Sequence, residues 1–132
     1  MATSINYLKR KLNSHPFCRL KKRESWVREL LPLVEEDYQE LFKVYLYCSD
    51  KDFSADIINQ FWSKIIPICP TIEDFQKLYF LVDETHEKAL FLKGISLCKT
   101  YSNILFIESF FGYKRKDEDL LRAIQTKRDE LN

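Results

Sequence analysis

The sequence predicts an all-α protein with about seven or eight helices. The expected arrangement is a compact right-handed stack of helical hairpins of the α-solenoid type, or else a helix bundle. Three observations favour this class. The 132 residues include only two Gly and four Pro, the residues that short strands and hairpin turns require. Apolar residues recur at helical spacing, and one pattern of helix, proline and helix occurs twice along the chain.

The repeated pattern contains a proline between two apolar helical segments. Residues 26–33 read WVRELLPL and residues 61–68 read FWSKIIPI, so the order of aromatic, charged and aliphatic residues recurs around the proline. Proline disfavours helical geometry in the residue before it and has no N–H to donate inside a helix. We therefore expect one helix to end near Pro32 and another near Pro67.

The repeat and the composition predict the domain organisation. We expect one helical domain over residues 1–132, with a hairpin-like internal repeat at 26–48 and 61–82 and a basic N-terminal segment at 1–23. Repeats of two helices cannot bury their apolar faces alone and therefore stack on one another. A duplicated hairpin inside a bundle fits the same pattern nearly as well, so both arrangements stay open.

The first four expected helices follow from apolar spacing and from their boundaries. Ile5, Leu8 and Leu12 share one face of the first helix. The second helix ends near Pro32, and the acids after it suit the positive end of a third helix. The stretch SADIINQFWSKII has a wide apolar stripe, and we expect its Ile65 in the core. The four helices are expected at residues 3–13, 24–31, 36–48 and 54–66.

The last four expected helices are separated by the polar connections CPT, DET and YKRKDED. Thr71 and Asp74 have the spacing of a helix cap. The stretch KLYFLV, residues 77–82, is apolar nearly all round its helix, so we expect this helix to be central and Leu78 to be buried. We expect the last helix to dock through Leu120, Leu121, Ile124 and Leu131. The four helices are expected at residues 72–82, 85–98, 102–112 and 117–130.

The charges are distributed unevenly along the chain. Residues 1–29 hold eight Lys and Arg and two acids, whereas residues 30–110 hold seven Lys and Arg and thirteen acids. A basic surface can contact the phosphates of nucleic acid or of a membrane, or an acidic protein, and it can also be an ordinary solvated face. The candidate phosphate-binding residues are Lys9, Arg10, Lys11, Arg19, Lys21, Lys22 and Arg23.

A second candidate site combines acids with aromatic residues on the two repeated helices. Rigid aromatic side chains are common anchors of protein interfaces, and nearby charges accelerate the encounter with a partner. The candidate partner-binding residues are Glu36, Asp37, Tyr38, Tyr45, Glu73, Asp74, Phe75 and Tyr79. We expect at least one of these tyrosines to be exposed beside an acid. The competing expectation is that the rings belong to the core.

No pattern in the sequence indicates catalysis. The two Gly cannot form a glycine-rich phosphate loop, and His15 and His86 are more typical of surface histidines than of general bases. The four cysteines lie far apart, without the close pairs of zinc sites, and are expected to be reduced thiols. Their positions are Cys18, Cys48, Cys69 and Cys98. We therefore expect no enzyme activity, no metal and no cofactor.

These observations together favour a helical protein-binding module in the cytoplasm, acting as an adaptor, inhibitor or regulatory subunit. The alternative is an RNA- or DNA-binding protein that uses the basic N-terminal segment. No apolar run approaches the roughly 20 residues that cross a bilayer. The acid-free residues 1–23 also share the composition of a mitochondrial presequence. The pattern does not specify an oligomeric state.

Overall fold

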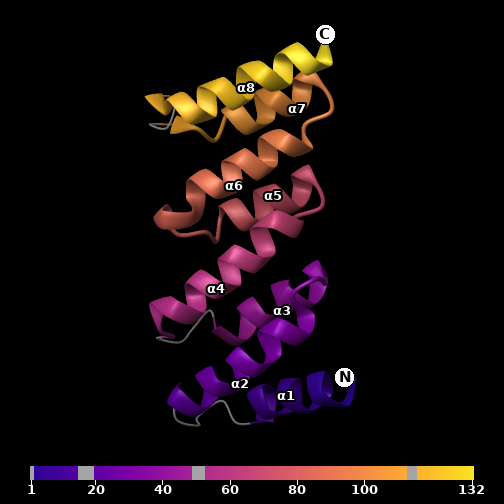
Figure 1. Cartoon of the computed structure of the whole chain (residues 1–132), viewed down its shortest axis with the longest axis vertical. Coiled ribbons are helices and arrows are strands. Elements are labelled where there is room, and N and C mark those ends of the chain that lie inside the picture. The colour runs from indigo at the N-terminus through magenta and orange to yellow at the C-terminus, as the bar shows by residue number, and fades with distance from the viewer. Residues whose placement is uncertain (1, 15–19, 49–52, 113–115) are drawn as a thin grey trace. The chain divides into compact units, whose positions relative to one another are not determined.

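The computed structural model describes residues 2–14, 20–48, 53–112 and 116–132. Within these ranges 82 % of the residues are helical and none is in a strand, which confirms the all-α class (Figure 1). The contacts divide the chain into two units, Met1–Ile68 and Cys69–Asn132. No helix in the described part of the chain is long and apolar enough to span a membrane.

The first unit consists of two helical hairpins. Its elements are α1 (Ala2–Ser14), α2 (Leu20–Val34), α3 (Tyr38–Cys48), α4 (Ala55–Ile65) and the short 3₁₀ helix η1 (Ile66–Ile68). Helix α2 packs against α1, α3 and α4. The largest fully buried side chains of this unit come from all four helices: Leu12, Leu30, Leu31, Leu41, Ile57, Trp62 and Ile65.

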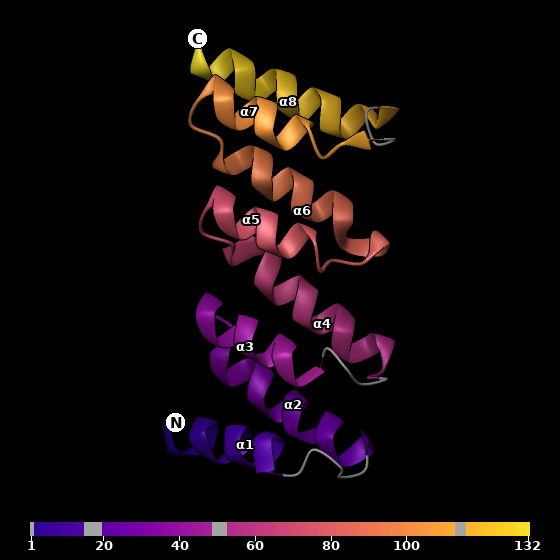
Figure 2. The ribbon, with the colours of Figure 1, turned by 180° about the vertical axis from the view of Figure 1, so that it is seen from behind.

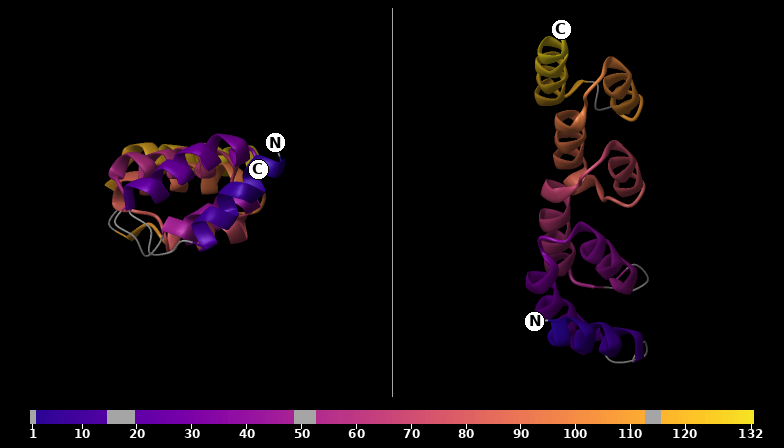
Figure 3. Two further views of the ribbon diagram at one scale, coloured as in Figure 1. Left: turned by 90° about the horizontal axis from the view of Figure 1, so that it is seen from below. Right: turned by 90° about the vertical axis from the view of Figure 1, so that its right-hand side faces the viewer.

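The second unit has the same plan. Its helices are α5 (Ile72–Tyr79), α6 (Glu84–Leu97), α7 (Tyr101–Glu108) and α8 (Glu118–Leu131). Helix α6 packs against α5, α7 and α8, as α2 does against its neighbours. Within this unit α5 and α7 lie on one side and α6 and α8 on the other, which is visible edge-on (Figure 3) and from behind (Figure 2). The outer surfaces of α5 and α7 therefore form one face.

Side-chain caps fix where the helices of the second unit begin. The Thr71 hydroxyl accepts a hydrogen bond from the Asp74 backbone N–H at 3.1 Å, which confirms the cap expected there. The carboxylate of Asp83 accepts from the His86 backbone N–H at 3.0 Å, and the hydroxyl of Thr100 accepts from the Asn103 N–H at 3.1 Å. These caps satisfy N–H groups that have no partner inside the helix.

Four expected helix boundaries, on three helices, differ from those of the structure by three or four residues. Helix α2 begins at Leu20 and continues two residues beyond Pro32, whose ring is exposed to solvent. Helix α5 ends at Tyr79, because the N–H groups of Leu81 and Val82 both turn back to the carbonyl of Leu78. Helix α7 ends at Glu108, four residues before the expected end at 112.

The two copies of the expected repeat have equivalent burial around their prolines. In the first copy Val27, Leu30 and Leu31 are buried and Pro32 is exposed. In the second copy the equivalent positions are Trp62, Ile65, Ile66 and Pro67, and they show the same pattern of exposure. The second copy crosses from the first unit into the second, so the repeat as a single folding unit stays a prediction.

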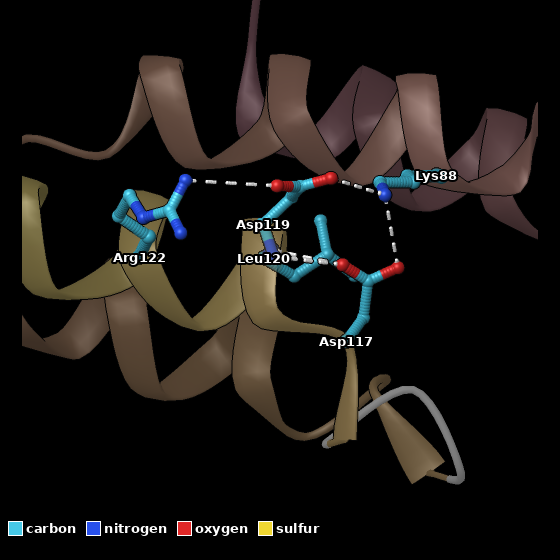
Figure 4. A network of polar contacts seen from close by, with 5 residues as sticks. All are labelled: Lys88, Asp117, Asp119, Leu120 and Arg122. Carbon is cyan, nitrogen blue, oxygen red and sulfur yellow. Dashed lines mark hydrogen bonds and ion pairs between the residues drawn. The ribbon is translucent and has the colours of Figure 1, made fainter.

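A polar network joins α6 to the start of α8 (Figure 4). The Lys88 ammonium lies 3.1 Å from the Asp117 carboxylate and 2.7 Å from the Asp119 carboxylate. Asp117 also caps α8 by accepting hydrogen bonds from the backbone N–H groups of Asp119 and Leu120. One lysine therefore connects two helices and supports a helix cap.

Candidate functional site: a groove between α5 and α7

The candidate site is a groove between α5 and α7 in the second unit. It consists of two adjoining hollows of about 280 and 350 Å³ that share Ile72, Glu73 and Asn103. The remaining lining residues are Pro70, Thr71, Gln76, Leu97, Lys99, Ser102 and Phe106. Both hollows lie open at the surface, so an extended chain could enter along the groove.

Helical periodicity explains why these side chains face one another. On α5, Ile72 and Gln76 are four residues apart, and Phe80 follows after four more. On α7, Asn103 and Phe106 are three residues apart. The buried faces of the same helices hold Phe75 and Leu78 on α5 and Ile104 and Ile107 on α7, so the groove residues lie beside the core face.

Phe106, which lines one hollow, also belongs to a cluster of four aromatic rings. We call Tyr79, Phe80, Phe106 and Phe110 the ring cluster. The centroid of the Phe110 ring lies 4.8 Å from that of Tyr79, 5.1 Å from that of Phe106 and 6.2 Å from that of Phe80. Phe80 is 68 % exposed, whereas phenylalanine is among the residues that are most often fully buried.

The ring cluster is anchored on the core of the second unit. The Phe110 ring lies 6.0 Å from the buried Phe75, and the Tyr79 ring lies 5.7 Å from the buried Phe91. The Tyr79 hydroxyl donates a hydrogen bond to the Phe110 carbonyl at 3.4 Å. The cluster therefore presents apolar surface at fixed positions.

The polar lining of the groove carries little net charge. Glu73 and Lys99 have opposite charges, and Gln76, Ser102 and Asn103 are neutral. The side-chain oxygen of Asn103 accepts a hydrogen bond from the Lys99 backbone N–H at 3.0 Å. Since this bond orients the amide, its two side-chain N–H groups are the atoms left to donate to a ligand.

The expectation that a predicted tyrosine is exposed beside an acid is wrong. Tyr38 is only 8 % exposed and Phe75 is fully buried, so both rings belong to the core. Tyr45 and Tyr79 are half-buried. These rings are covered because they pack against other aromatic rings. The Tyr45 ring, for example, lies 5.7 Å from that of Phe61. A role for these residues in partner binding stays a prediction.

The predicted acids do not gather in the groove, although Glu36, Asp37 and Glu73 are exposed and Asp74 is half-buried. Glu36 and Asp37 belong to the first unit, where the Asp37 carboxylate accepts the backbone N–H of Glu40 at 3.1 Å. Glu73 lines both hollows of the second unit, whereas the Asp74 carboxylate accepts from the Thr71 hydroxyl at 2.8 Å. Of the predicted partner-binding residues, the structure thus places Glu73 in the groove and Tyr79 in the ring cluster.

Two of the predicted phosphate-binding residues are used inside the first unit. Arg23 is 4 % exposed and donates to the Leu12 carbonyl at 2.8 Å, so its expected role at the surface is wrong. The Lys9 ammonium pairs with the Glu40 carboxylate at 2.9 Å. Arg19 lies outside the described residues. The exposed members are Arg10, Lys21 and Lys22, and Lys11 is half-buried.

The sequence pattern did not indicate the residues that make the groove distinctive. Phe80, Phe106, Phe110, Gln76 and Asn103 were not candidates, and the expectation that KLYFLV is central is wrong for Phe80 and Leu81, which are exposed. A usable signal was present in that stretch. A helix that is apolar nearly all round offers more apolar surface than one core face can cover, so the excess must lie at the surface or at an interface.

Several titratable residues of the second unit, among them Asp83 and His86, make structural contacts. No cluster of His, Cys, Asp or Glu that could hold a metal occurs in the described ranges. Cys69 and Cys98 are free and buried, and burial raises the pKa of the Cys69 thiol to about 11. The His86 ring lies 2.8 Å from the carboxylate of Asp83, the residue that caps α6. Cys18, Cys48 and His15 lie where side chains are not described.

A comparison of the chain with protein-family models, curated proteins and solved structures found no match. The inference of function therefore depends on the groove and on the distribution of charge.

Proposed function

We propose that the protein is a non-enzymatic helical module that binds another protein, as an adaptor, inhibitor or regulatory subunit. The α5–α7 groove and the ring cluster receive an extended segment of the partner. The observation that carries this proposal is the exposed ring of Phe80 in a cluster whose other three rings are half-buried and which adjoins the groove at Phe106. Aromatic side chains in such positions are the usual anchors of protein interfaces.

The chemistry of the groove favours a polypeptide that is largely uncharged. Glu73 and Lys99 balance each other, so the lining offers no field that would attract a phosphate backbone. Gln76 and Asn103 carry amides, which combine donors and acceptors as a peptide group does. An extended segment would donate to and accept from these amides and place apolar side chains on the ring cluster.

The dimensions of the groove suit a short segment. Helix α5 has 8 residues and is therefore about 12 Å long. An extended chain advances about 3.3 Å per residue, so about four residues of the partner span this length. Because Phe75 and Phe91 hold the rings of Phe110 and Tyr79 in place, binding orders few side chains of this protein.

The free, buried thiols of Cys69 and Cys98 support a reducing compartment such as the cytoplasm for this activity.

Selection from a random-peptide library against the whole protein tests the proposal. We expect enrichment of uncharged peptides with aromatic or aliphatic residues at alternating positions. Their affinity should fall about tenfold or more for Phe80→Ser, because the ring supplies exposed apolar contact area. Asn103→Asp keeps the oxygen that accepts from the Lys99 N–H but removes the amide donors, so it should also weaken binding.

Leu121 was expected in the docking face of the last helix, but it is 46 % exposed on α8, so that expectation is wrong. Because Leu121 does not line the groove either, Leu121→Ser is the matched control. Its affinity for the selected peptides should equal that of the natural protein. Peptides that bind Phe80→Ser and the natural protein equally would contradict the proposed site. A library that yields no binding peptide would contradict the proposed mode of binding.

A further inference from the structure

We propose that the end of the α1–α2 hairpin binds single-stranded nucleic acid. This site lies in the first unit and is independent of the α5–α7 groove. Its residues are the bases Arg10, Lys11, Lys21 and Lys22, which we call the basic end, together with the exposed ring of Tyr7. Phosphates contact the four cations, and a base stacks on the ring.

The fold brings the four cations to one end of the hairpin. Arg10 and Lys11 lie close to the C-terminal end of α1, and Lys21 and Lys22 lie in the first turn of α2. The two helices pack against each other, and these two helix ends face the same side of the unit in both views of the ribbon (Figures 1 and 2). Residues 1–23 contain no acid that could neutralise them.

The structure separates these cations from the other bases of the segment. Lys9 pairs with Glu40 at 2.9 Å, and Arg28 pairs with Asp56 at 3.1 Å. None of the four cations of the basic end pairs with an acid in the part of the chain that the structure describes. The positive charge that remains after folding is therefore concentrated at this end of the hairpin.

The charges also oppose the dipole of α2. The first turn of this helix contains no acid and holds Lys21 and Lys22. The N-terminus of a helix carries partial positive charge, so cations there are unfavourable by themselves. A bound phosphate would offset the charge of the side chains and that of the helix end together.

The burial of the apolar face of α1 favours nucleic acid over a membrane as the ligand of the basic end. Leu8 and Leu12 are 4 % and 1 % exposed, so the apolar face of α1 is covered by its own unit and cannot enter a bilayer. The Tyr7 ring is 51 % exposed, and the Lys11 ammonium lies 5.4 Å from its centroid. An exposed ring beside cations is the combination that binds single strands by stacking and phosphate contact.

Fluorescence anisotropy with a labelled oligouridylate and the matching oligodeoxythymidylate tests this site on the whole chain. If four phosphates are neutralised, the logarithm of affinity should fall by about 3 for each tenfold rise in salt, since each contributes about 0.7 for single strands. Replacing the four cations by Gln should reduce affinity at low salt by at least a hundredfold. Tyr7→Leu should reduce it about tenfold, because base stacking is lost.

The matched control replaces four cations of the second unit by Gln and so changes the net charge equally. The exposed ones are Lys77, Lys116 and Arg122, and the fourth, Lys93, is half-buried as Lys11 is. We expect this control to keep most of the affinity. An equal loss in both quadruple variants would overturn the proposal, as would the absence of binding at low salt. Binding to phosphatidylserine vesicles but to neither oligonucleotide would assign the basic end to a membrane surface and overturn it as well.

Discussion

Gly94 determines how closely α6 approaches α5 and α7. A Cβ atom added to Gly94 would lie 2.7 Å from Cδ2 of Phe75 and 3.1 Å from Cδ1 of Ile107. Real Cβ atoms essentially never make the first of these contacts. Glycine inside a helix normally costs stability relative to alanine, so its presence here reflects the close packing of three helices.

We expect Gly94→Ala to destabilise the protein in spite of the better helix propensity of alanine. The gain in propensity is about 0.5–1 kcal/mol, whereas overpacking a core typically costs about 1–3 kcal/mol. The midpoint of urea unfolding should therefore fall. Adding Phe75→Leu should relieve the contact, so the double variant should lose less stability than the two single changes sum to. A higher midpoint for Gly94→Ala alone would contradict this account of the packing.

At this scale the sequence predicted some side-chain positions and not others. Ile65 and Leu78 were expected in the core, and both are fully buried. Phe75 and Phe80 are equally apolar, yet Phe75 is buried and Phe80 is 68 % exposed. The difference depends on where α5 ends and on which helix lies beside it, and neither follows from the hydrophobicity of the residue itself.

At the scale of elements, the start of α8 depends on the charge of Asp117. Partial desolvation raises the pKa of this carboxyl, but the Leu120 N–H, the Lys88 ammonium and the Asp119 N–H together hold it below its ordinary value. Hydrogen bonds from Lys88 to Asp119 and Asp117 raise the pKa of the lysine. The native fold therefore favours the ionised forms of both partners.

We expect Asp117→Asn to lower the melting temperature at pH 7 and to have a vanishing effect in acid. Asparagine can still cap a helix, so the variant removes the charge and keeps the cap. Because the pKa of Asp117 is lower in the folded state, its contribution is complete above the unfolded value near 4 and is lost as the pH falls through the folded value. Thermal melts between pH 7 and pH 2 measure the difference.

Glu118→Gln is a suitable control for this experiment, because Glu118 is the exposed neighbour of Asp117 on the same helix. At pH 7, Glu118→Gln should lower the melting temperature less than Asp117→Asn does. A difference between Asp117→Asn and the natural protein that stays constant to pH 2, or grows in acid, would show that the charge is not what stabilises the start of α8.

The sequence predicted the existence of the elements better than their ends. All eight expected helices are present, because their apolar spacing is clear. The positions of the prolines predicted the helix ends less well. Helix α4 ends at Ile65, two residues before Pro67, whereas α2 continues through Pro32 to Val34. Both prolines are exposed, so the exposure of the ring does not explain why only α2 continues past its proline.

At the scale of the whole molecule, each unit consists of two hairpins in which the second helix contacts the other three. The all-α class followed from composition and spacing, but the groove did not. Glu73 and Tyr79 were among the predicted site residues, whereas Gln76, Asn103 and Phe106 were not. These three meet only because α5 and α7 lie on the same side of α6, and that arrangement is tertiary.

Site-specific photocrosslinking tests the binding of a protein partner at the groove most directly. A benzophenone amino acid in place of Phe80 would be irradiated in nuclease-treated native extract, and the same amino acid in place of Leu121 would serve as the control. The account predicts a discrete crosslinked polypeptide from position 80 and none from position 121. No crosslinked polypeptide from position 80, or the same polypeptide with equal yield from both positions, would contradict it.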